Sequence, residues 1–268
     1  MSPSESGPSS AISRSLEPRA RIRRFRQAGR PRLGIIRKLM TIKRHVPKFH
    51  RATPEVRREA LVDATLRCLK QFGHEGVSVR RISAAAGVSI GLINHHFPSK
   101  SGLIAETYET LALSLLDSIR SQAENKAVSP RDRLSNFLRA SFAPEILDPQ
   151  LFNVWLVFWS MVAHSPEIRA VHLSTYGKYR AALESLLGQL VDCGAAPPFR
   201  LRPAAIALSA FLDGFWVELS LSPTVFKPSE ALALCEDWVN ALCNGSFPRL
   251  LAGPRAKRTE SVPRRRKP

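Results

Sequence analysis

The segment Gly87–Lys100, with the sequence GVSIGLINHHFPSK, is the part of the chain that most restricts its fold. It opens on a turn signal, because glycine permits the turn, valine can fill the core beside it and serine can cap the helix that follows. Pro98 disfavours helical geometry at the residue before it, so that helix is short. A helix with Ser78 as its cap precedes the turn. Residues 78–97 therefore have the spacing of a helix-turn-helix.

The helix after the turn has one face that suits a core, because Ile93 and Phe97 lie four residues apart. The residues on or beside its opposite face are Ile90, Gly91, Leu92, Asn94 and His95. An exposed isoleucine and leucine suit contact with thymine methyl groups, and a glycine permits close approach of the backbone to DNA. The sequence therefore predicts a surface that reads DNA.

Two helices are predicted before the turn. The first begins at Thr53-Pro54, a capping hydroxyl followed by proline at the first helical position, and ends at Gly73. Its expected buried face is Leu61, Ala64, Cys68 and Phe72. The second is expected to point Val79, Ile82, Ala85 and Ala86 inward and Arg80 and Arg81 outward.

The rest of the chain also has helical periodicity. A long helix capped by Ser99 is predicted to run to about Glu124, with an apolar stripe along it. Further helices are predicted near residues 130–143, 149–163, 165–191, 202–221 and 228–243. No convincing strand is present. The predicted fold is all-α, with a three-helix helix-turn-helix domain (53–115) and a six-helix domain (116–252).

The positive charge of the chain is concentrated at its two ends. Residues 1–52 contain 14 Lys/Arg and two acids, and residues 253–268 contain seven Lys/Arg and one acid. The remainder holds 19 basic and 19 acidic residues, so the body is neutral. Within it, basic residues outnumber acids between Thr53 and Lys100, as a phosphate-binding surface requires.

Residues 1–52 are rich in Ser, Pro, Gly and Arg without a sustained helical stripe, so both ends are expected to be disordered. The first segment has three readings: a solvated leader, an additional DNA-binding arm, or residues upstream of the true translation start. The third reading would place that start at Met40, and an intact-mass measurement of the native protein would show whether residues 1–39 exist.

Several classes of protein are disfavoured. The adjacent His95 and His96 point about 100° apart on a helix, so they do not chelate one metal ion together. The chain lacks H-E-x-x-H, G-x-S-x-G and P-loop motifs, so neither an enzyme nor a cofactor is predicted. Four cysteines without C-x2-C spacing suit a reducing cytoplasm. The sequence contains neither a run of 18 uncharged apolar residues nor the pattern of a secretory signal. A membrane-spanning or exported protein is therefore not predicted.

The sequence around the turn resembles the TetR family of bacterial transcriptional repressors in the order of its features, which are a core valine, a capping serine, a buried apolar stripe and a following lysine. The matching residues are Gly87 to Phe97, then Lys100 and Leu103. Within that family the chain resembles the BetI-type, choline-responsive repressors of the betaine pathway. The segments that carry this second resemblance are Gly102-Leu103-Ile104, Trp155-Leu156-Val157-Phe158-Trp159 and Leu212-Asp213-Gly214-Phe215-Trp216. The chain departs from the family pattern at Asn94 and His96, where the former is usually aromatic, so the resemblance does not extend to the operator sequence.

The resemblance implies a cytoplasmic bacterial homodimer that binds a palindromic operator in double-stranded DNA, with one recognition helix from each subunit in successive major grooves. Residues that it places at bases or the adjacent backbone are Ser89, Ile90, Gly91, Leu92, Asn94 and His95. Residues that it places at phosphates are Ser78, Arg81, His96 and Lys100.

The resemblance also implies that the larger domain dimerises and holds a small-molecule effector. Dimerisation is expected through 202–221 and 228–243, with apolar faces from Ile206, Phe211, Phe215, Trp238 and Leu242. A pocket for a quaternary ammonium, such as choline or betaine aldehyde, is expected from Trp155, Phe158, Trp159, Tyr176, Asp213, Trp216 and Glu218. The effector is expected to shift the long fourth helix and so change the spacing of the recognition helices.

Two alternatives remain open at the level of sequence. The aromatic residues can be ordinary core residues, although Asp213 in an apolar helix needs a partner. The chain can also be a nonspecific nucleic-acid-binding protein that uses its basic ends. Deleting residues 1–52 and 253–268 would then abolish DNA binding, whereas a repressor would retain operator binding.

Overall fold

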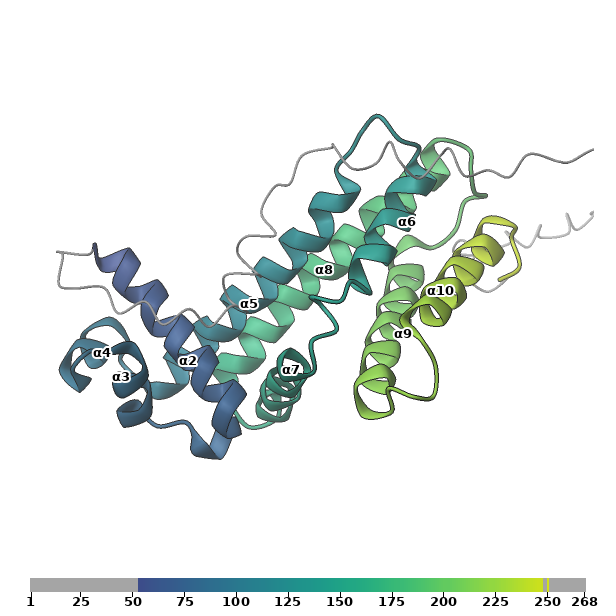
Figure 1. Cartoon of the computed structure of the whole chain (residues 1–268). Helices are drawn as coiled ribbons and strands as arrows, with labels where there is room; N and C mark the ends of the chain where they lie inside the picture. The colour runs from purple at the N-terminus through teal and green to yellow at the C-terminus, as the bar shows by residue number, and fades with distance from the viewer. Residues whose placement is uncertain (1–52, 248–249, 251–268) are drawn as a thin grey trace, which may run out of the picture. The chain divides into compact units, whose positions relative to one another are not determined.

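The computed structural model describes residues 53–247 and residue 250. These residues form nine α-helices and no strand, which confirms the predicted all-α class (Figure 1). The helices are α2 (Pro54–Gly76), α3 (Val79–Ala86), α4 (Ile90–His96), α5 (Lys100–Ala123), α6 (Pro130–Ser141), α7 (Pro149–Val162), α8 (Pro166–Asp192), α9 (Leu201–Leu221) and α10 (Pro228–Cys243). The predictions for residues 1–52, Met40 and residues 253–268 lie outside the described residues.

Side-chain hydroxyls cap the first four helices, as predicted. The hydroxyls of Thr53, Ser78, Ser89 and Ser99 accept hydrogen bonds from the amides of Val56, Arg81, Leu92 and Gly102 at 3.4, 3.3, 3.2 and 2.9 Å. At the turn between α3 and α4, Gly87 adopts a left-handed φ of 67°. Glycine is the residue that reaches this conformation without a steric penalty, which explains its presence at the turn.

Three details of the helical core differ from the sequence prediction. Gly73 breaks the helical geometry of α2 with φ 63° and ψ −167°, but one more turn continues to Gly76. Phe72 is exposed rather than buried, and its ring contacts the guanidinium of Arg81, 4.6 Å from the centroid, instead of the core. Ala85 is also exposed, since Ile82 is the residue through which the short α3 enters the core.

The long helix α5 is central to the packing. It contacts α2, α6 and α8, while α8 also packs against α9 and α2 against α7. Tyr108 of α5, Phe137 of α6 and Phe158 of α7 are among the largest fully buried side chains. α5 runs without interruption across the predicted domain boundary between residues 115 and 116, so it joins the helix-turn-helix region to the remaining helices (Figure 1).

Candidate functional site

Helix α4, the predicted recognition helix, presents an uncharged surface. The cap Ser89 and helix residues Ile90, Gly91, Asn94 and His95 are exposed, whereas Leu92 and His96 are half-buried. On the opposite face, Ile93 and the following Phe97 are buried, as predicted. A Cβ at Gly91 would meet nothing closer than the Ser89 hydroxyl at 3.9 Å, so the surface beside this backbone is open. The exposed set offers apolar, amide and imidazole groups for contact with base edges.

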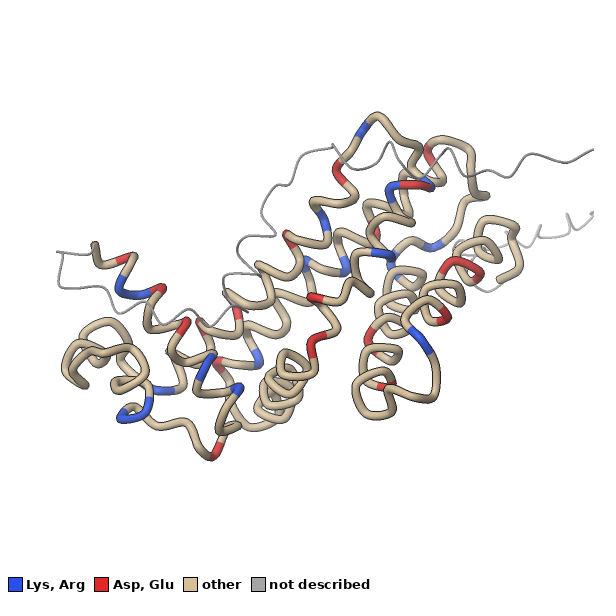
Figure 2. The backbone as a smooth tube through the Cα atoms, in the orientation of Figure 1, with Lys and Arg blue, Asp and Glu red and all other residues tan. Residues whose placement is uncertain are grey.

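Positive charge surrounds α4 but does not lie on it. Figure 2 shows α4 without Lys, Arg, Asp or Glu, while Arg80 and Arg81 lie on α3 and Lys100 begins α5. Two of these cations are engaged within the protein: Arg81 donates a hydrogen bond to the carbonyl of Gly76, and Lys100 Nζ donates to the carbonyl of Val77 at 3.3 Å. Both hold the corner between α2 and α3, a role that the sequence did not indicate.

The two histidines differ in their surroundings. His95 is exposed, and its ring meets that of His96 edge-on at 5.3 Å between centroids. The Nε2 atom of His96 is buried and has no hydrogen-bond partner among the described residues. That nitrogen is therefore not open to a DNA phosphate in this conformation, and the phosphate contact of His96 stays a prediction. Among the described residues, no group of three or more His, Cys, Asp or Glu side chains is placed to hold a metal ion.

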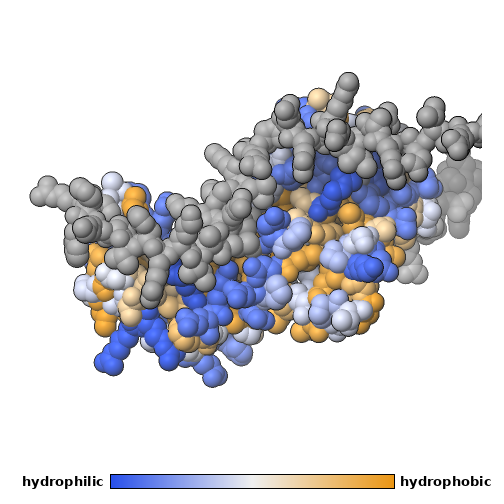
Figure 3. Space-filling model, viewed as in Figure 1, coloured by the Kyte–Doolittle hydropathy of each residue, from blue (hydrophilic) through white to orange (hydrophobic). Residues whose placement is uncertain are grey.

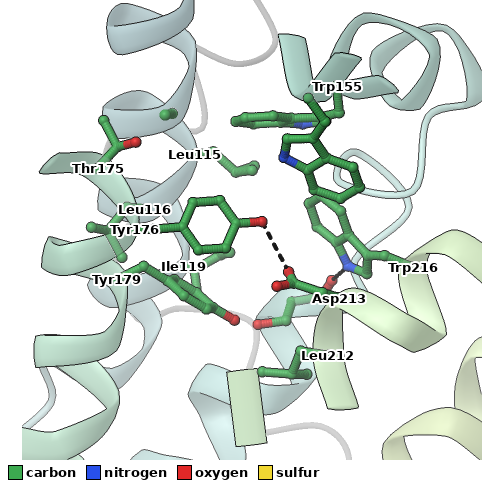
Figure 4. A pocket seen from close by; sticks show the side chains of 13 residues that line it. Leu115, Leu116, Ile119, Trp155, Thr175, Tyr176, Tyr179, Leu212, Asp213 and Trp216 are labelled. Atoms are coloured by element: carbon green, nitrogen blue, oxygen red, sulfur yellow. Dashed lines mark hydrogen bonds between the residues drawn. The ribbon is translucent and has the colours of Figure 1, made fainter. Parts of the chain in front are cut away.

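A cavity of about 70 Å³ lies among α5, α6, α7, α8 and α9 (Figure 4). It is lined by Ala112, Leu115, Leu116, Ile119, Ser141, Trp155, Trp159, Thr175, Tyr176, Tyr179, Leu212, Asp213 and Trp216. A water molecule needs about 10–15 Å³ of such space, so a small organic molecule fits better than a single water. Five aromatic rings and one carboxyl group suit an organic cation.

Asp213 is the acidic group of the cavity. Figure 4 shows it opposite Tyr176, whose hydroxyl donates a hydrogen bond to Asp213 Oδ1 at 3.3 Å. Burial raises the pKa of Asp213 from 3.8 to about 6, although this hydrogen bond and the charge of Arg180 act to lower it. The carboxylate is therefore poorly compensated within the protein, and a bound cation would stabilise it.

An open depression adjoins the cavity and shares Trp159, Tyr176 and Asp213 with it. His172 also lines this depression. Its Nδ1 lies 2.8 Å from the hydroxyl of Tyr108, and burial together with Arg180 lowers its pKa. The three shared residues therefore lie between the depression and the cavity.

Hydrogen bonding differs among the indole groups of the cavity. Trp216 Nε1 donates to the carbonyl of Ser141 at 2.9 Å. Trp155 is almost fully buried, and its Nε1 has no hydrogen-bond partner among the described residues. Trp159 Nε1 is also buried without a partner among the described residues, so two of the three indole donors of the cavity lining are unsatisfied.

Two residues predicted for the pocket do not line it. Phe158 belongs to the core, where its ring stacks on Tyr108 with 4.5 Å between centroids. Glu218 is exposed, because five residues along α9 turn it about 140° away from Asp213. Conversely, the sequence prediction missed Tyr179 and Thr175 of α8. The spacing of Thr175, Tyr176 and Tyr179 along one helix was a signal that pointed to a shared face.

Apolar side chains are exposed on α9 and α10, a region where Figure 3 shows apolar residues at the surface. Ile206 and Phe211 of α9 are 45% and 42% exposed, and Leu234 of α10, which was not predicted, is 51% exposed. Leu242 is fully buried, in contrast to its predicted place on this face, because it packs inward from α10. By length and composition alone α9 could cross a membrane, a test that core helices of soluble proteins also pass.

Comparisons with known families match two parts of the chain. Residues 61–107 match the model for bacterial regulatory proteins of the tetR family. Residues 130–244 match the model for the C-terminal domain of BetI-type transcriptional repressors. The first match contains the helix-turn-helix, and the second contains most of the residues that line the cavity.

Individual proteins extend these similarities. The regulator BetI of Burkholderia thailandensis is 31% identical over 189 residues, covering 70% of this chain and 94% of that protein. BetI of Rhizobium meliloti is 34% identical over 186 residues, covering 69% and 89%. A transcriptional regulator from Pseudomonas aeruginosa PAO1 has 44% identity and a TM-score of 0.69, covering 75% and 96%. A regulator from Saccharomonospora viridis, solved in complex with choline, shares the fold at 19% identity and a TM-score of 0.61, covering 69% and 96%.

Proposed function

This chain belongs to the TetR family of bacterial regulatory proteins, with a C-terminal domain of the BetI type, and from that premise we propose that choline or a related quaternary ammonium releases it from its operator. As a ligand-responsive transcriptional repressor it binds DNA and is not an enzyme. The observation that carries the proposal of a cationic effector is the poorly compensated carboxyl group of Asp213 inside an aromatic cavity.

The chemistry of the cavity supports this class of effector. A quaternary ammonium group has no N–H to donate, so the faces of aromatic rings and a nearby carboxylate are the groups that attract it. Trp155 supplies a buried donor without a partner, which suits the hydroxyl of choline or the carbonyl of betaine aldehyde. A regulator of the same fold was solved in complex with choline.

Calorimetric titration of the protein with choline tests the proposal. We expect heat of binding, together with release of the protein from operator DNA in a gel-shift assay at the same choline concentrations. If choline gives no heat while another compound releases the DNA, that compound replaces choline as the effector. The nonspecific nucleic-acid-binding alternative is not favoured, because both family matches lie within the body of the chain rather than in its basic ends.

We further propose that the protein binds its operator as a cytoplasmic homodimer. The exposed apolar side chains of α9 and α10, among them Ile206, Phe211 and Leu234, support this assignment. Large apolar side chains exposed on a monomer mark interaction sites, because their contact with water is unfavourable. Two recognition helices related by a two-fold axis would then meet two half-sites of a palindrome.

The residues of the proposed DNA interface divide into two roles that mutation separates. Lys100→Ala is expected to weaken binding to all duplexes alike. It should also reduce the slope of log K against log salt concentration by about 1, the value for one lost phosphate contact. Asn94→Ala is expected to relax sequence preference, at a cost of about 1–3 kcal/mol on the preferred site. Measurement of Kd on the operator and on unrelated DNA over a range of salt concentrations separates the two.

Lys126→Ala is the matched control, because Lys126 is exposed between α5 and α6, away from the helix-turn-helix. This variant removes the same charge and should leave both the affinity for DNA and the sequence preference unchanged. Unaltered operator binding in both the Lys100 and the Asn94 variants would contradict this assignment of the interface.

A further inference from the structure

Arg58 connects the recognition helix to α5, although it belongs to neither. It lies on α2, and its Nε donates to Glu106 Oε1 of α5 at 2.5 Å, while its Nη2 donates to Glu106 Oε2. Its remaining terminal nitrogen, Nη1, donates to the carbonyl of His96 at 3.1 Å. The guanidinium carbon also lies 4.4 Å from the centroid of the Phe97 ring. One side chain thus makes four contacts with two other helical segments.

These contacts fall at the carboxyl end of α4. His96 is the last residue of that helix, and Phe97 is its C-cap. The last carbonyl groups of a helix lack partners within it, and the helix dipole favours a cation there. Arg58 supplies both a hydrogen-bond donor and a positive charge. The contact with the Phe97 ring holds the same end of the helix from the side of the core.

The other end of this connection leads toward the cavity. Glu106 lies on α5, and the same uninterrupted helix contributes Ala112, Leu115, Leu116 and Ile119 to the cavity lining. A displacement of α5 by a ligand would therefore move the carboxylate that holds Arg58. The chain contains a direct mechanical link between the helix that lines the cavity and the helix that reads DNA.

We propose that Arg58 is a positioning residue for operator binding, which holds the carboxyl end of α4 against α5 through Glu106 and does not itself bind a DNA phosphate. The inference rests on the operator binding stated above. It gives Arg58 and Glu106 a function that neither the helix-turn-helix motif nor the cavity assigns.

The rival role for Arg58 is a phosphate contact, since its side chain is 45% exposed and the DNA-binding region is nearby. The two roles predict opposite signs for Glu106→Gln. Removing the negative charge would free a phosphate-binding Arg58 and strengthen DNA binding. The same change would loosen α4 and weaken operator binding if Arg58 positions that helix.

The experiment uses the full chain and a duplex operator selected from random DNA with the wild-type protein. Variants Arg58→Lys, Glu106→Gln and the double variant are compared with Arg57→Gln, which removes a neighbouring exposed charge whose side chain makes no hydrogen bond or ion pair with the described residues. Arg58→Lys keeps the positive charge but loses the planar fork that contacts three groups at once. Selection of an operator by the wild type tests operator binding independently of the variants.

We expect Arg58→Lys and Glu106→Gln each to weaken operator binding by about tenfold, with an unchanged slope of log K against log salt concentration. The double variant should be no weaker than Arg58→Lys, because both changes break the same ion pair. Arg57→Gln should have a smaller effect. Thermal unfolding of each variant checks that the fold is retained, and the conservative Glu106→Gln change keeps an acceptor in place.

Two results would overturn the inference. One is tighter DNA binding by Glu106→Gln, which identifies Arg58 as a phosphate contact. The other is wild-type operator affinity in both Arg58→Lys and Glu106→Gln, which shows that the connection does not position α4.

Discussion

Replacing Asp213 with Asn is expected to abolish the response to choline while making the ligand-free protein more stable. The variant keeps the size of the side chain and its ability to accept the hydrogen bond from Tyr176, but it removes the charge that would face the cation. Loss of a desolvated ion pair of this kind weakens binding by about 100-fold or more. Calorimetry should therefore detect no binding at choline concentrations that saturate the wild type.

The stability change follows from the raised pKa of Asp213, from 3.8 to about 6. The folded state holds the proton more tightly than the unfolded state, so the wild type loses stability as pH rises from about 4 to 6, and the loss is complete above that range. This difference in the pKa of Asp213 between the folded and unfolded states corresponds to about 3 kcal/mol in the free energy of unfolding. Asp213→Asn should regain much of it at pH 7.5 and little at pH 4.

Denaturant unfolding at both pH values measures this difference. Asp117→Asn on α5 is the control, because Asp117 is exposed and does not line the cavity. An Asp213→Asn variant that binds choline normally would contradict the role of the carboxylate. A variant that binds no choline, but whose free energy of unfolding shows no pH-dependent gain over the wild type, would contradict the buried state of that carboxylate.

Replacing Ile206 with Glu is expected to convert the dimer to a monomer and to lower operator affinity by about 100-fold or more, because the second half-site is then no longer bound by a linked partner. Ile206 is an apolar residue that is 45% exposed on the surface of α9. A carboxylate on that surface would meet its symmetry-related copy, or apolar groups, in a dimer, and both contacts are unfavourable.

Analytical ultracentrifugation gives the oligomeric state, and a gel-shift titration gives the affinity. Leu156→Glu is the control, since it places the same charge at a comparably exposed apolar position on α7. The control should remain dimeric with unaltered operator binding. Persistence of the dimer in Ile206→Glu would show that subunits meet through another surface.

The sequence alone determined the order of the helices and the helix-turn-helix at residues 78–97. The reason is that the decisive contacts are local. The caps at Ser78 and Ser89 each bind an amide three residues ahead, and Gly87 forms the turn through its own φ angle. The exposed side of α4 also followed from the spacing of Ile93 and Phe97.

The tertiary structure decided which residues meet to form a site. Asp213 and Tyr176 are 37 residues apart in the chain, and Arg58 and Glu106 are 48 apart. The periodicity of one helix does not specify which neighbouring helix its polar residues face, so Glu218 was placed in the cavity and Tyr179 was missed. Because packing between helices brings such groups together and removes them from water, the raised pKa of Asp213 and the contacts of Arg58 exist only in the folded chain.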